Sequence, residues 1–205
     1  MYLYMLPSVG IMLAISLGIN VLLLVLFLEQ RRIITTDTLT GLLNKVGLFE
    51  ARRKYTRRKN SDGFWMFDRR KRHNETGGAV LYIDLDKFKP VNDKYGHHVG
   101  DVLIVEFSKF LKEHVRSKDT LARLHGDEFV VILEDVDEDE AKKIGSNIVE
   151  RLRAHTFNVH EHEIKLEATV GVAVMKHGGR FDFDALIEEA DHAMLNSKQG
   201  AREHR

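Results

Sequence analysis

Two pairs of acidic residues carry the side chains best suited to catalysis. Asp84 and Asp86 follow an apolar run at 79–83 that predicts a buried strand, while Asp127 and Glu128 lie between two apolar runs that predict a β-hairpin. If the strand and the hairpin are neighbours, Asp84 and Asp127 converge on an oxygen-rich site that suits Mg²⁺ or Mn²⁺. Because Mg²⁺ usually fills its remaining positions with water and substrate phosphates, such a site favours nucleoside triphosphate chemistry. Either acidic pair taken alone is a weak signal, and an acidic hairpin tip is as often only a solvated turn.

The composition narrows the chemistry that is available. The chain of 205 residues contains no cysteine, which excludes disulfide scaffolds, thiolate zinc sites and cysteine nucleophiles. Lysine plus arginine total 31, as do aspartate plus glutamate, so the net charge gives no general attraction to nucleic acid. The length leaves room for one ordinary domain plus an appendage. Catalysis must therefore rest on carboxylates, histidines, lysines or a metal ion.

An uncharged segment near the N-terminus has the length of a membrane span. Residues 9–28 carry no charge and, at about 1.5 Å per residue, would cover about 30 Å, the thickness of a bilayer's hydrocarbon core. The segment lacks the basic start and small-residue cleavage site of a secretory signal, so we expect an uncleaved anchor. Arg31 and Arg32 follow it and nothing basic precedes it, which places the rest of the chain in the cytoplasm. The predicted division is a short extracytoplasmic N-terminus at 1–8, a transmembrane helix at 9–29 and a connector at 30–36.

Small residues recur along one face of this predicted helix. Gly10, Ala14 and Gly18 are spaced four residues apart, so a second copy of the helix could approach closely there. Small residues are also common in membrane helices that do not associate. The sequence leaves dimerisation through this face open.

A strongly basic segment follows the first part of the soluble region. Residues 51–72 contain ten lysines and arginines against two aspartates, with an aromatic run at 64–67. Such a segment could lie on anionic lipid or bind nucleic acid. A solvated helix end and loop is the preferred interpretation, because charge runs are usually solvated. We treat about 57–77 as a basic aromatic insert.

The soluble part alternates between helical and strand patterns. Capping residues at 36–40 precede an apolar-periodic run through Leu42, Leu43, Val46 and Phe49, which predicts a helix. Apolar spacing then predicts helices at 101–115 and 137–153, hairpin strands at 120–124 and 129–133, strands near 156–175 and a last helix near 182–198. This order predicts an α/β fold class.

Four separated blocks of sequence occur in a specific order. They are Asp37–Asn44, Asp84–Asp101, Arg123–Phe129 and Ala168–Ala173. Together they resemble the GGDEF family of diguanylate cyclases, and the resemblance covers essentially everything after residue 36. It implies that residues 37–205 form one GGDEF domain with the family's palm-like fold. That fold is an α+β sandwich in which helices flank a central, mainly antiparallel sheet.

The resemblance implies roles for the acidic residues. Asp84, Leu85 and Asp127 match the family's metal positions, and Asp84, Asp127 and Glu128 match its catalytic centre. The expected cofactor is Mg²⁺, with Mn²⁺ as the alternative.

The resemblance also implies a GTP site. Asn92 and Asp101 match guanine-recognising positions, and a carboxylate can accept hydrogen bonds from the N1–H and N2 amine of guanine, a pattern that adenine lacks. Lys89 and Lys198 match lysines that hold the triphosphate, and Gly126 leaves the hairpin main chain open to phosphate. Alternatively, Asn92 and Asp101 are a turn residue and a helix cap. The implied substrate-binding residues are Asn92, Asp101, Lys89, Phe88, Gly126 and Lys198.

A product-inhibition site is implied ahead of the hairpin. Arg116 and Asp119 match the family's RxxD inhibitory motif, in which arginine can pair with phosphate or guanine. Without the family context, an exposed, salt-bridged helix end would be the better interpretation.

As a whole, the resemblance implies an enzyme that condenses two GTP molecules into cyclic di-GMP and two pyrophosphates. In this family each domain binds one GTP, and two domains meet face to face. The expected partners are therefore GTP, cyclic di-GMP as product and feedback ligand, a second copy of the chain and the bacterial inner membrane. No nucleic-acid partner is expected. The expected location is a single pass through the inner membrane, with the catalytic domain in the cytoplasm.

Three features of the sequence depart from the family's pattern. His125 replaces the first glycine of the signature, and if that position needs a positive φ, histidine costs about 1 kcal/mol more than glycine. The spacing between Asn44 and Asp84 is longer than usual, and no arginine directly follows Gly200. The alternative function is a catalytically silent GGDEF domain that binds GTP or cyclic di-GMP as a regulator.

Overall fold

The structure, a computed structural model, describes residues 6–51, 53, 77–175 and 183–203. Its strands are β1 (Gly77–Asp86), β2 (Thr120–His125), β3 (Glu128–Val136), β4 (Phe157–Val159), β5 (His162–Ile164) and β6 (Glu167–Val174). Its helices are α1 (Leu6–Thr35), α3 (Phe88–Tyr95), α4 (His97–His114), α5 (Glu138–Ala154) and α6 (Phe183–Glu203), with a further short helix at 45–51.

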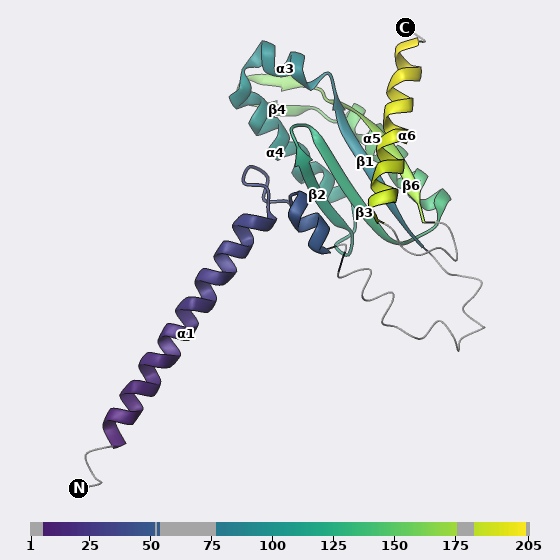
Figure 1. Cartoon of the computed structure of the whole chain (residues 1–205). Helices are drawn as coiled ribbons and strands as arrows, with labels where there is room; N and C mark the ends of the chain where they lie inside the picture. The colour runs from purple at the N-terminus through teal and green to yellow at the C-terminus, as the bar shows by residue number, and fades with distance from the viewer. Residues whose placement is uncertain (1–5, 52, 54–76, 176–182, 204–205) are drawn as a thin grey trace, which may run out of the picture.

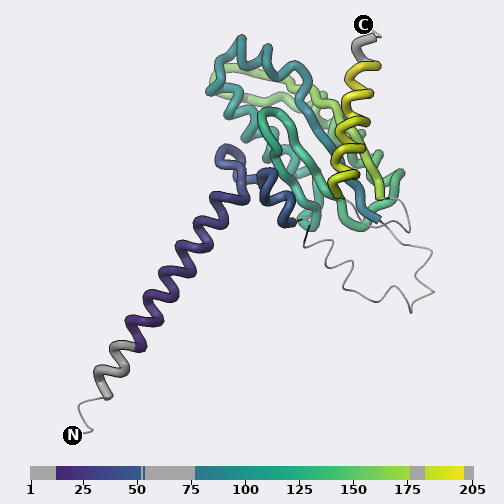
Figure 2. Tube along the Cα trace, in the orientation of Figure 1, coloured from purple at the N-terminus to yellow at the C-terminus, as the bar shows by residue number. Residues whose placement is uncertain are grey.

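Four strands form one antiparallel sheet in the order β2-β3-β1-β6, and β4 pairs with β5 in a separate hairpin. Helices α4 and α5 pack on one face of the sheet, and α6 covers the other (Figure 1). The trace in Figure 2 shows α1 leaving this layered domain as a separate arm. The predicted antiparallel sheet flanked by helices is confirmed.

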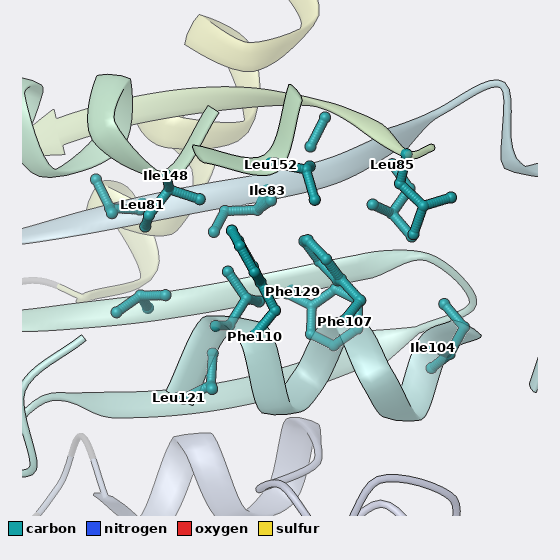
Figure 3. Close-up of a cluster of buried hydrophobic side chains, with 14 of the residues drawn as sticks. Leu81, Ile83, Leu85, Ile104, Phe107, Phe110, Leu121, Phe129, Ile148 and Leu152 are labelled. Carbon is teal, nitrogen blue, oxygen red and sulfur yellow. The ribbon is translucent and has the colours of Figure 1, made fainter. Parts of the chain in front are cut away.

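The core lies on both sides of β1. Leu81 and Ile83 point into the cluster beneath α4 and α5, where Phe107 and Phe129 meet edge to face with ring centroids 5.1 Å apart (Figure 3). The alternate residues of β1 join the cluster beneath α6. Because both faces are buried, β1 reads in the sequence as a continuous apolar run rather than as an alternating one. The acids at its carboxyl end are thereby held by a strand that cannot easily shift.

Helix α1 is longer than the segment predicted to cross a membrane. We expected the helix to end at residue 29 and a connector to span 30–36, but the helix continues through Arg31 and Arg32 to Thr35. No glycine or proline interrupts it there, and Arg31 lies 3.4 Å from the Glu50 carboxylate of the next helix. By length and composition, its portion Leu13–Thr35 could cross a membrane, and none of that portion is buried in the domain.

The turn after α1 is fixed to the helix end. Asn44 donates through Nδ2 to the carbonyl oxygens of Ile34 and Thr36 at 2.9 and 3.0 Å, and through its main-chain N–H to that of Thr35 at 3.0 Å. Leu43, predicted to lie in a helix, instead forms β-bridges to Thr36 and Ala122, so the helix begins only at residue 45. No free linker separates α1 from the domain.

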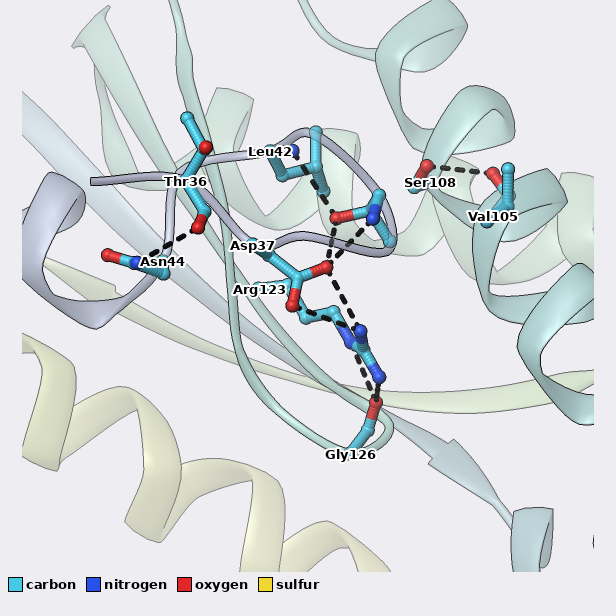
Figure 4. A network of polar contacts seen from close by, with 9 residues as sticks. Thr36, Asp37, Leu42, Asn44, Val105, Ser108, Arg123 and Gly126 are labelled. Carbon is cyan, nitrogen blue, oxygen red and sulfur yellow. Dashed lines mark hydrogen bonds and ion pairs between the residues drawn. The ribbon is translucent and has the colours of Figure 1, made fainter. Parts of the chain in front are cut away.

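A polar network continues from this turn to the hairpin (Figure 4). Asp37 accepts hydrogen bonds from Thr40 N–H and hydroxyl at 2.9 and 2.6 Å, and its two oxygens lie 3.0 and 3.1 Å from Arg123 Nη1. Arg123 also donates through Nε and Nη2 to the Gly126 carbonyl oxygen at 2.9 and 2.8 Å. Burial alone would raise the pKa of Asp37, but the hydrogen bonds from Thr40 and the Arg123 guanidinium outweigh it and lower that pKa. The network connects the end of α1 to the hairpin bend.

One other predicted boundary differs from the structure. Helix α4 begins at His97 rather than at residue 101, because Gly96, with φ of 87°, ends α3 and opens α4 directly. The basic aromatic insert predicted at about 57–77 lies outside the described residues, except that Gly77 begins β1.

Replacing Gly171 by alanine should destabilise the domain. A Cβ at this position of β6 would lie 1.9 Å from the Ala190 carbonyl oxygen and 2.5 Å from the Met194 main-chain nitrogen, both in α6. Since backbone atoms must move, we expect a loss of about 2 kcal/mol in the free energy of unfolding, measured by urea titration of the detergent-solubilised chain. Gly200→Ala is the control, because nothing lies within 4 Å of its added Cβ. Equal stability of the two variants would contradict this packing.

Asp37→Asn should weaken the link between α1 and the hairpin. The Arg123 and Asp37 side chains are 12% and 21% exposed, so loss of the charged acceptor is expected to cost about 2 kcal/mol at neutral pH. The pKa of Asp37 is lowered in the folded chain, so this contribution is fully present above the ordinary value of 3.8 and is lost as pH falls through the lower, folded value. The difference between wild type and variant should therefore shrink in acid. Glu138→Gln, which breaks an exposed pair with Lys142, serves as control and should change little. The idea fails if both variants lose the same stability.

Candidate active site at the hairpin edge of the sheet

The β1–β3 pairing brings the two acidic pairs together. Asp84 lies opposite Glu128 in the antiparallel register, and the Leu85 N–H donates to the Asp127 carbonyl oxygen at 3.3 Å. The expectation that the strand and the hairpin are neighbours is confirmed. Because side chains alternate along a strand, Asp84 and Asp86 share the face covered by α6, while Leu85 is buried in the opposite core. Leu85 could therefore contact a metal only through its main-chain carbonyl.

Lys198 of α6 reaches this edge of the sheet. Its ammonium group forms a hydrogen-bonded ion pair with Asp84 and lies 3.5 Å from Asp86 Oδ1. Asp86 is held from the other side by the Thr169 hydroxyl, which lies 2.9 and 3.0 Å from its two oxygens. Lys198, which the family resemblance implies holds the triphosphate, thus pairs with acids of the site in this structure.

The acids still hold excess negative charge. Burial raises the pKa of Asp84, the charges of Asp127 and Asp86 raise it further, and the pairing with Lys198 offsets only part of this effect. Among the described residues no group of three or more histidines or acids is arranged to hold a metal ion. Mg²⁺ needs only one or two carboxylates, however, and a set of oxygen donors with excess negative charge fits such an ion.

Two side chains, Tyr82 and His125, lie against the Glu128 carboxylate, and the sequence did not predict either contact. The buried Tyr82 hydroxyl donates to Glu128 Oε2 at 2.5 Å, and His125 Nε2 lies 3.2 Å from the same oxygen. Burial raises the pKa of Tyr82, and the neighbouring Glu128 carboxylate raises it further, so the hydroxyl stays protonated. The two-residue spacing between Tyr82 and Asp84, which puts both on one face of β1, was the available signal.

The hairpin bend does not strain His125. The left-handed conformation belongs to Gly126, with φ of 52°, whereas His125 has no positive φ and is the last residue of β2. The conformational cost considered for histidine at this position therefore does not arise. Gly126 is exposed at the bend, where its carbonyl oxygen accepts hydrogen bonds from Arg123.

The residues expected to recognise guanine lie on α3 and α4. The Asn92 Oδ1 atom is buried and has no hydrogen-bond partner among the described residues, and a Cβ at Gly100 would lie 1.8 Å from it. Asn92 is inside α3 and Asp101 is inside α4, so the alternative assignment as turn residue and helix cap is wrong. Phe88 is buried beside Gly100, at 8% exposure. Among the described residues, the structure therefore leaves one buried acceptor unsatisfied beside Gly100, the residue that precedes the exposed Asp101 in α4.

Lys89 and the RxxD motif lie apart from the acids. Lys89 is exposed in the first turn of α3, and the structure describes no contact between it and the acidic residues. Arg116 forms an ion pair with Glu140, while Asp119 accepts hydrogen bonds from Arg116 N–H at 2.9 Å and Glu134 N–H at 3.2 Å. The motif stands at the start of β2, about five residues or 17 Å of strand from the hairpin bend.

Comparison with known sequences supports one family. The family described as diguanylate cyclase, GGDEF domain, matches residues 34–204. The bifunctional diguanylate cyclase/cyclic di-GMP phosphodiesterase MucR of Pseudomonas aeruginosa is 39% identical over 124 residues, which are 60% of this chain and 18% of that protein. The chain spans less than a third of the length of the first curated relatives it matches, at 18%, 24% and 28%.

Two solved structures from Caulobacter crescentus share the architecture. A sensory box/GGDEF family protein is 30% identical with a TM-score of 0.67, and the match covers 81% of this chain and 99% of that one. The coiled coil and GGDEF domain of DgcB, solved in complex with c-di-GMP, is 24% identical with a TM-score of 0.76, covering 94% and 95%; at this identity it shows the fold alone. Given the family match over residues 34–204, the chain belongs to the GGDEF-domain diguanylate cyclase family.

Proposed function

We propose that the chain is a diguanylate cyclase that condenses two GTP molecules into cyclic di-GMP and two pyrophosphates. The observation that carries the proposal is the β1–β3 register, which sets Asp84 opposite Glu128 with Asp127 beside them at one edge of the sheet. Relatives named diguanylate cyclase, such as DosC and DgcZ of Escherichia coli, are 35% and 33% identical over the shared region. We transfer the activity named for these relatives to this chain because Asp84, Asp127 and Glu128 match the family's catalytic positions.

The substrate is GTP in this proposal. The unsatisfied Asn92 Oδ1 and the exposed Asp101 carboxylate are acceptors that suit the N1–H and N2 amine of guanine. Lys89 and Lys198 supply positive charge for the triphosphate, and Lys198 must then release Asp84 and Asp86. Phe88, one helical turn before Asn92 in α3, stays among the proposed substrate-binding residues.

Asp84, Asp127 and the Leu85 carbonyl would hold a Mg²⁺ or Mn²⁺ ion. Such an ion lowers the pKa of a ribose hydroxyl and neutralises phosphoryl charge. The Glu128 carboxylate accepts the proton of the 3′-hydroxyl as this oxygen forms a bond to the α-phosphorus of the second GTP. The bond from that phosphorus to the pyrophosphate oxygen breaks in line, and pyrophosphate leaves with its electron pair.

The reaction needs two chains, because each domain holds one GTP. We propose an antiparallel meeting of two domains, assisted by α1 anchors that lie in the same inner membrane with the domain on the cytoplasmic side, where Arg31 and Arg32 follow the span. Contact between anchors at Gly10, Ala14 and Gly18 would raise the effective concentration further. Cyclic di-GMP would inhibit at Arg116 and Asp119 by exchanging for Glu140 on Arg116.

The alternative, a silent domain that binds nucleotide as a regulator, depended on His125. The absence of positive φ at His125 removes the conformational argument for inactivity. Activity is therefore the preferred proposal.

Incubation of the full chain in detergent with GTP and Mg²⁺ should yield cyclic di-GMP, measured by chromatography. Glu128→Gln should lower kcat by about a hundredfold or more while GTP still binds, since the amide cannot accept the proton. Glu161→Gln, in the exposed β4–β5 turn, is the matched control and should retain wild-type activity. Absence of product from the wild type at high, dimer-forming concentration would leave the silent-domain alternative.

Mg²⁺ with a non-hydrolysable GTP analogue should stabilise the chain. At a free analogue concentration a hundred times its Kd, the free energy of unfolding should rise by about 2.7 kcal/mol. Asp84→Asn and Asp127→Asn should each lose the Mg²⁺-dependent part of this gain, whereas the exposed Asp139→Asn should keep it. An Mg²⁺ effect that survives in both site variants would place the ion elsewhere.

A further inference from the structure

We propose that Tyr82 and His125 are positioning residues that hold one oxygen of Glu128 and leave its other oxygen directed to the nucleotide. The inference rests on the catalytic role proposed for Glu128. Both side chains approach the same atom: the Tyr82 hydroxyl donates to Glu128 Oε2 at 2.5 Å, and His125 Nε2 lies 3.2 Å from it.

Three neighbouring strands supply this arrangement. Tyr82 comes from the middle of β1, His125 is the last residue of β2 and Glu128 is the first residue of β3. In the sheet order β2-β3-β1, the carboxylate stands between its two donors. A glutamate on a hairpin bend would otherwise sample several rotamers, so two donors on one oxygen select the orientation before substrate arrives.

The two donors differ in how firmly they are held. Tyr82 is 6% exposed and packs in the core beneath α6 with Val80 and Val130, so its ring cannot swing away from Glu128. Burial and the carboxylate keep its pKa high, and the hydroxyl remains a donor. The His125 side chain is 72% exposed and approaches the same oxygen from the solvent side. Tyr82 is therefore the fixed donor and His125 the adjustable one.

This geometry suggests a role for His125, which stands where the family signature has glycine. A glycine at position 125 has no side chain, so Tyr82 alone would hold Glu128. With histidine, the ring nitrogen Nε2 comes within 3.2 Å of the carboxylate, and position 125 does not need a left-handed backbone. An oriented general base is effective because proton transfer needs heavy atoms within hydrogen-bond distance in the reacting complex.

The test uses kinetics of the full chain with Tyr82→Phe, His125→Gly, His125→Gln and the Tyr82→Phe/His125→Gly double variant. Tyr82→Phe should lower kcat about tenfold with the KM for GTP and the Tm nearly unchanged, because the orientation of the base is lost while binding persists. His125→Gly should lower kcat by about threefold, and His125→Gln, which keeps an N–H donor, should restore it. Tyr95→Phe is the matched control, since Tyr95 packs against His162 outside the site.

The double variant separates a shared task from two unrelated defects. If both donors hold one oxygen, each partly replaces the other, so the double variant should lose more than the product of the single losses, about a hundredfold. The inference is overturned if Tyr82→Phe keeps the wild-type kcat, or if its fall in kcat comes with an equal rise in KM or a lower Tm. It is also overturned if the loss in the double variant equals the product of the two single losses. Full activity of Glu128→Gln would instead remove the catalytic role on which it rests.

Discussion

The antiparallel register between β1 and β3 is the constraint on which the site depends. Side chains alternate along a strand, so a slip of one residue would turn Asp84 into the core and bring Leu85 to the α6 face. The core prevents that slip, because Leu81 and Ile83 are fully buried against α4 and α5 and burial of each such side chain is worth about 1.5–3 kcal/mol. Apolar residues that touch no ligand therefore determine where the acids stand.

Helix α6 is the second requirement, since it brings Lys198 to the acids. The helix can lie this close to β6 only because Gly171 has no side chain, as the distances to the Ala190 and Met194 main chain indicate. The ammonium group of Lys198 pairs with Asp84 and lies near Asp86, and burial together with the charges of Asp127 and Asp86 still raises the pKa of Asp84. Neighbouring like charges lower the stability of the folded chain, and packing in the core offsets that loss. Such arrangements are typical of functional sites.

The sequence predicted the parts of the fold that rest on local signals. The buried strand, the hairpin and α5 were identified from their apolar patterns. The helix predicted to begin at residue 137 starts one residue later, because Asp137 is its N-cap and accepts a hydrogen bond from the Glu140 N–H. Periodicity also places Asp84 and Asp86 on one face. The site's acids were therefore found in advance, although their roles remain predictions.

Contacts that depend on chain pairing could not be predicted in the same way. Arg123 and Asp37 are 86 positions apart, and Tyr82 and Glu128 are 46 apart, so no local pattern links them. The predicted helix through Leu43 failed because a β-bridge to Ala122 competes with helix formation there. For His125, residue type alone did not reveal the backbone conformation, since the bend places its left-handed residue at Gly126 instead.

The direct junction at Thr35 and Asn44 has a geometric consequence. A domain on a flexible linker can take many positions and orientations relative to its anchor, so two such domains must meet by diffusion in three dimensions. Here hydrogen bonds from Asn44 to the last turn of α1 fix the height and tilt of the domain relative to its helix. In the membrane-anchored dimer proposed above, this junction would keep the nucleotide sites of two chains at equal height above the bilayer, so that their encounter would be a search within a plane.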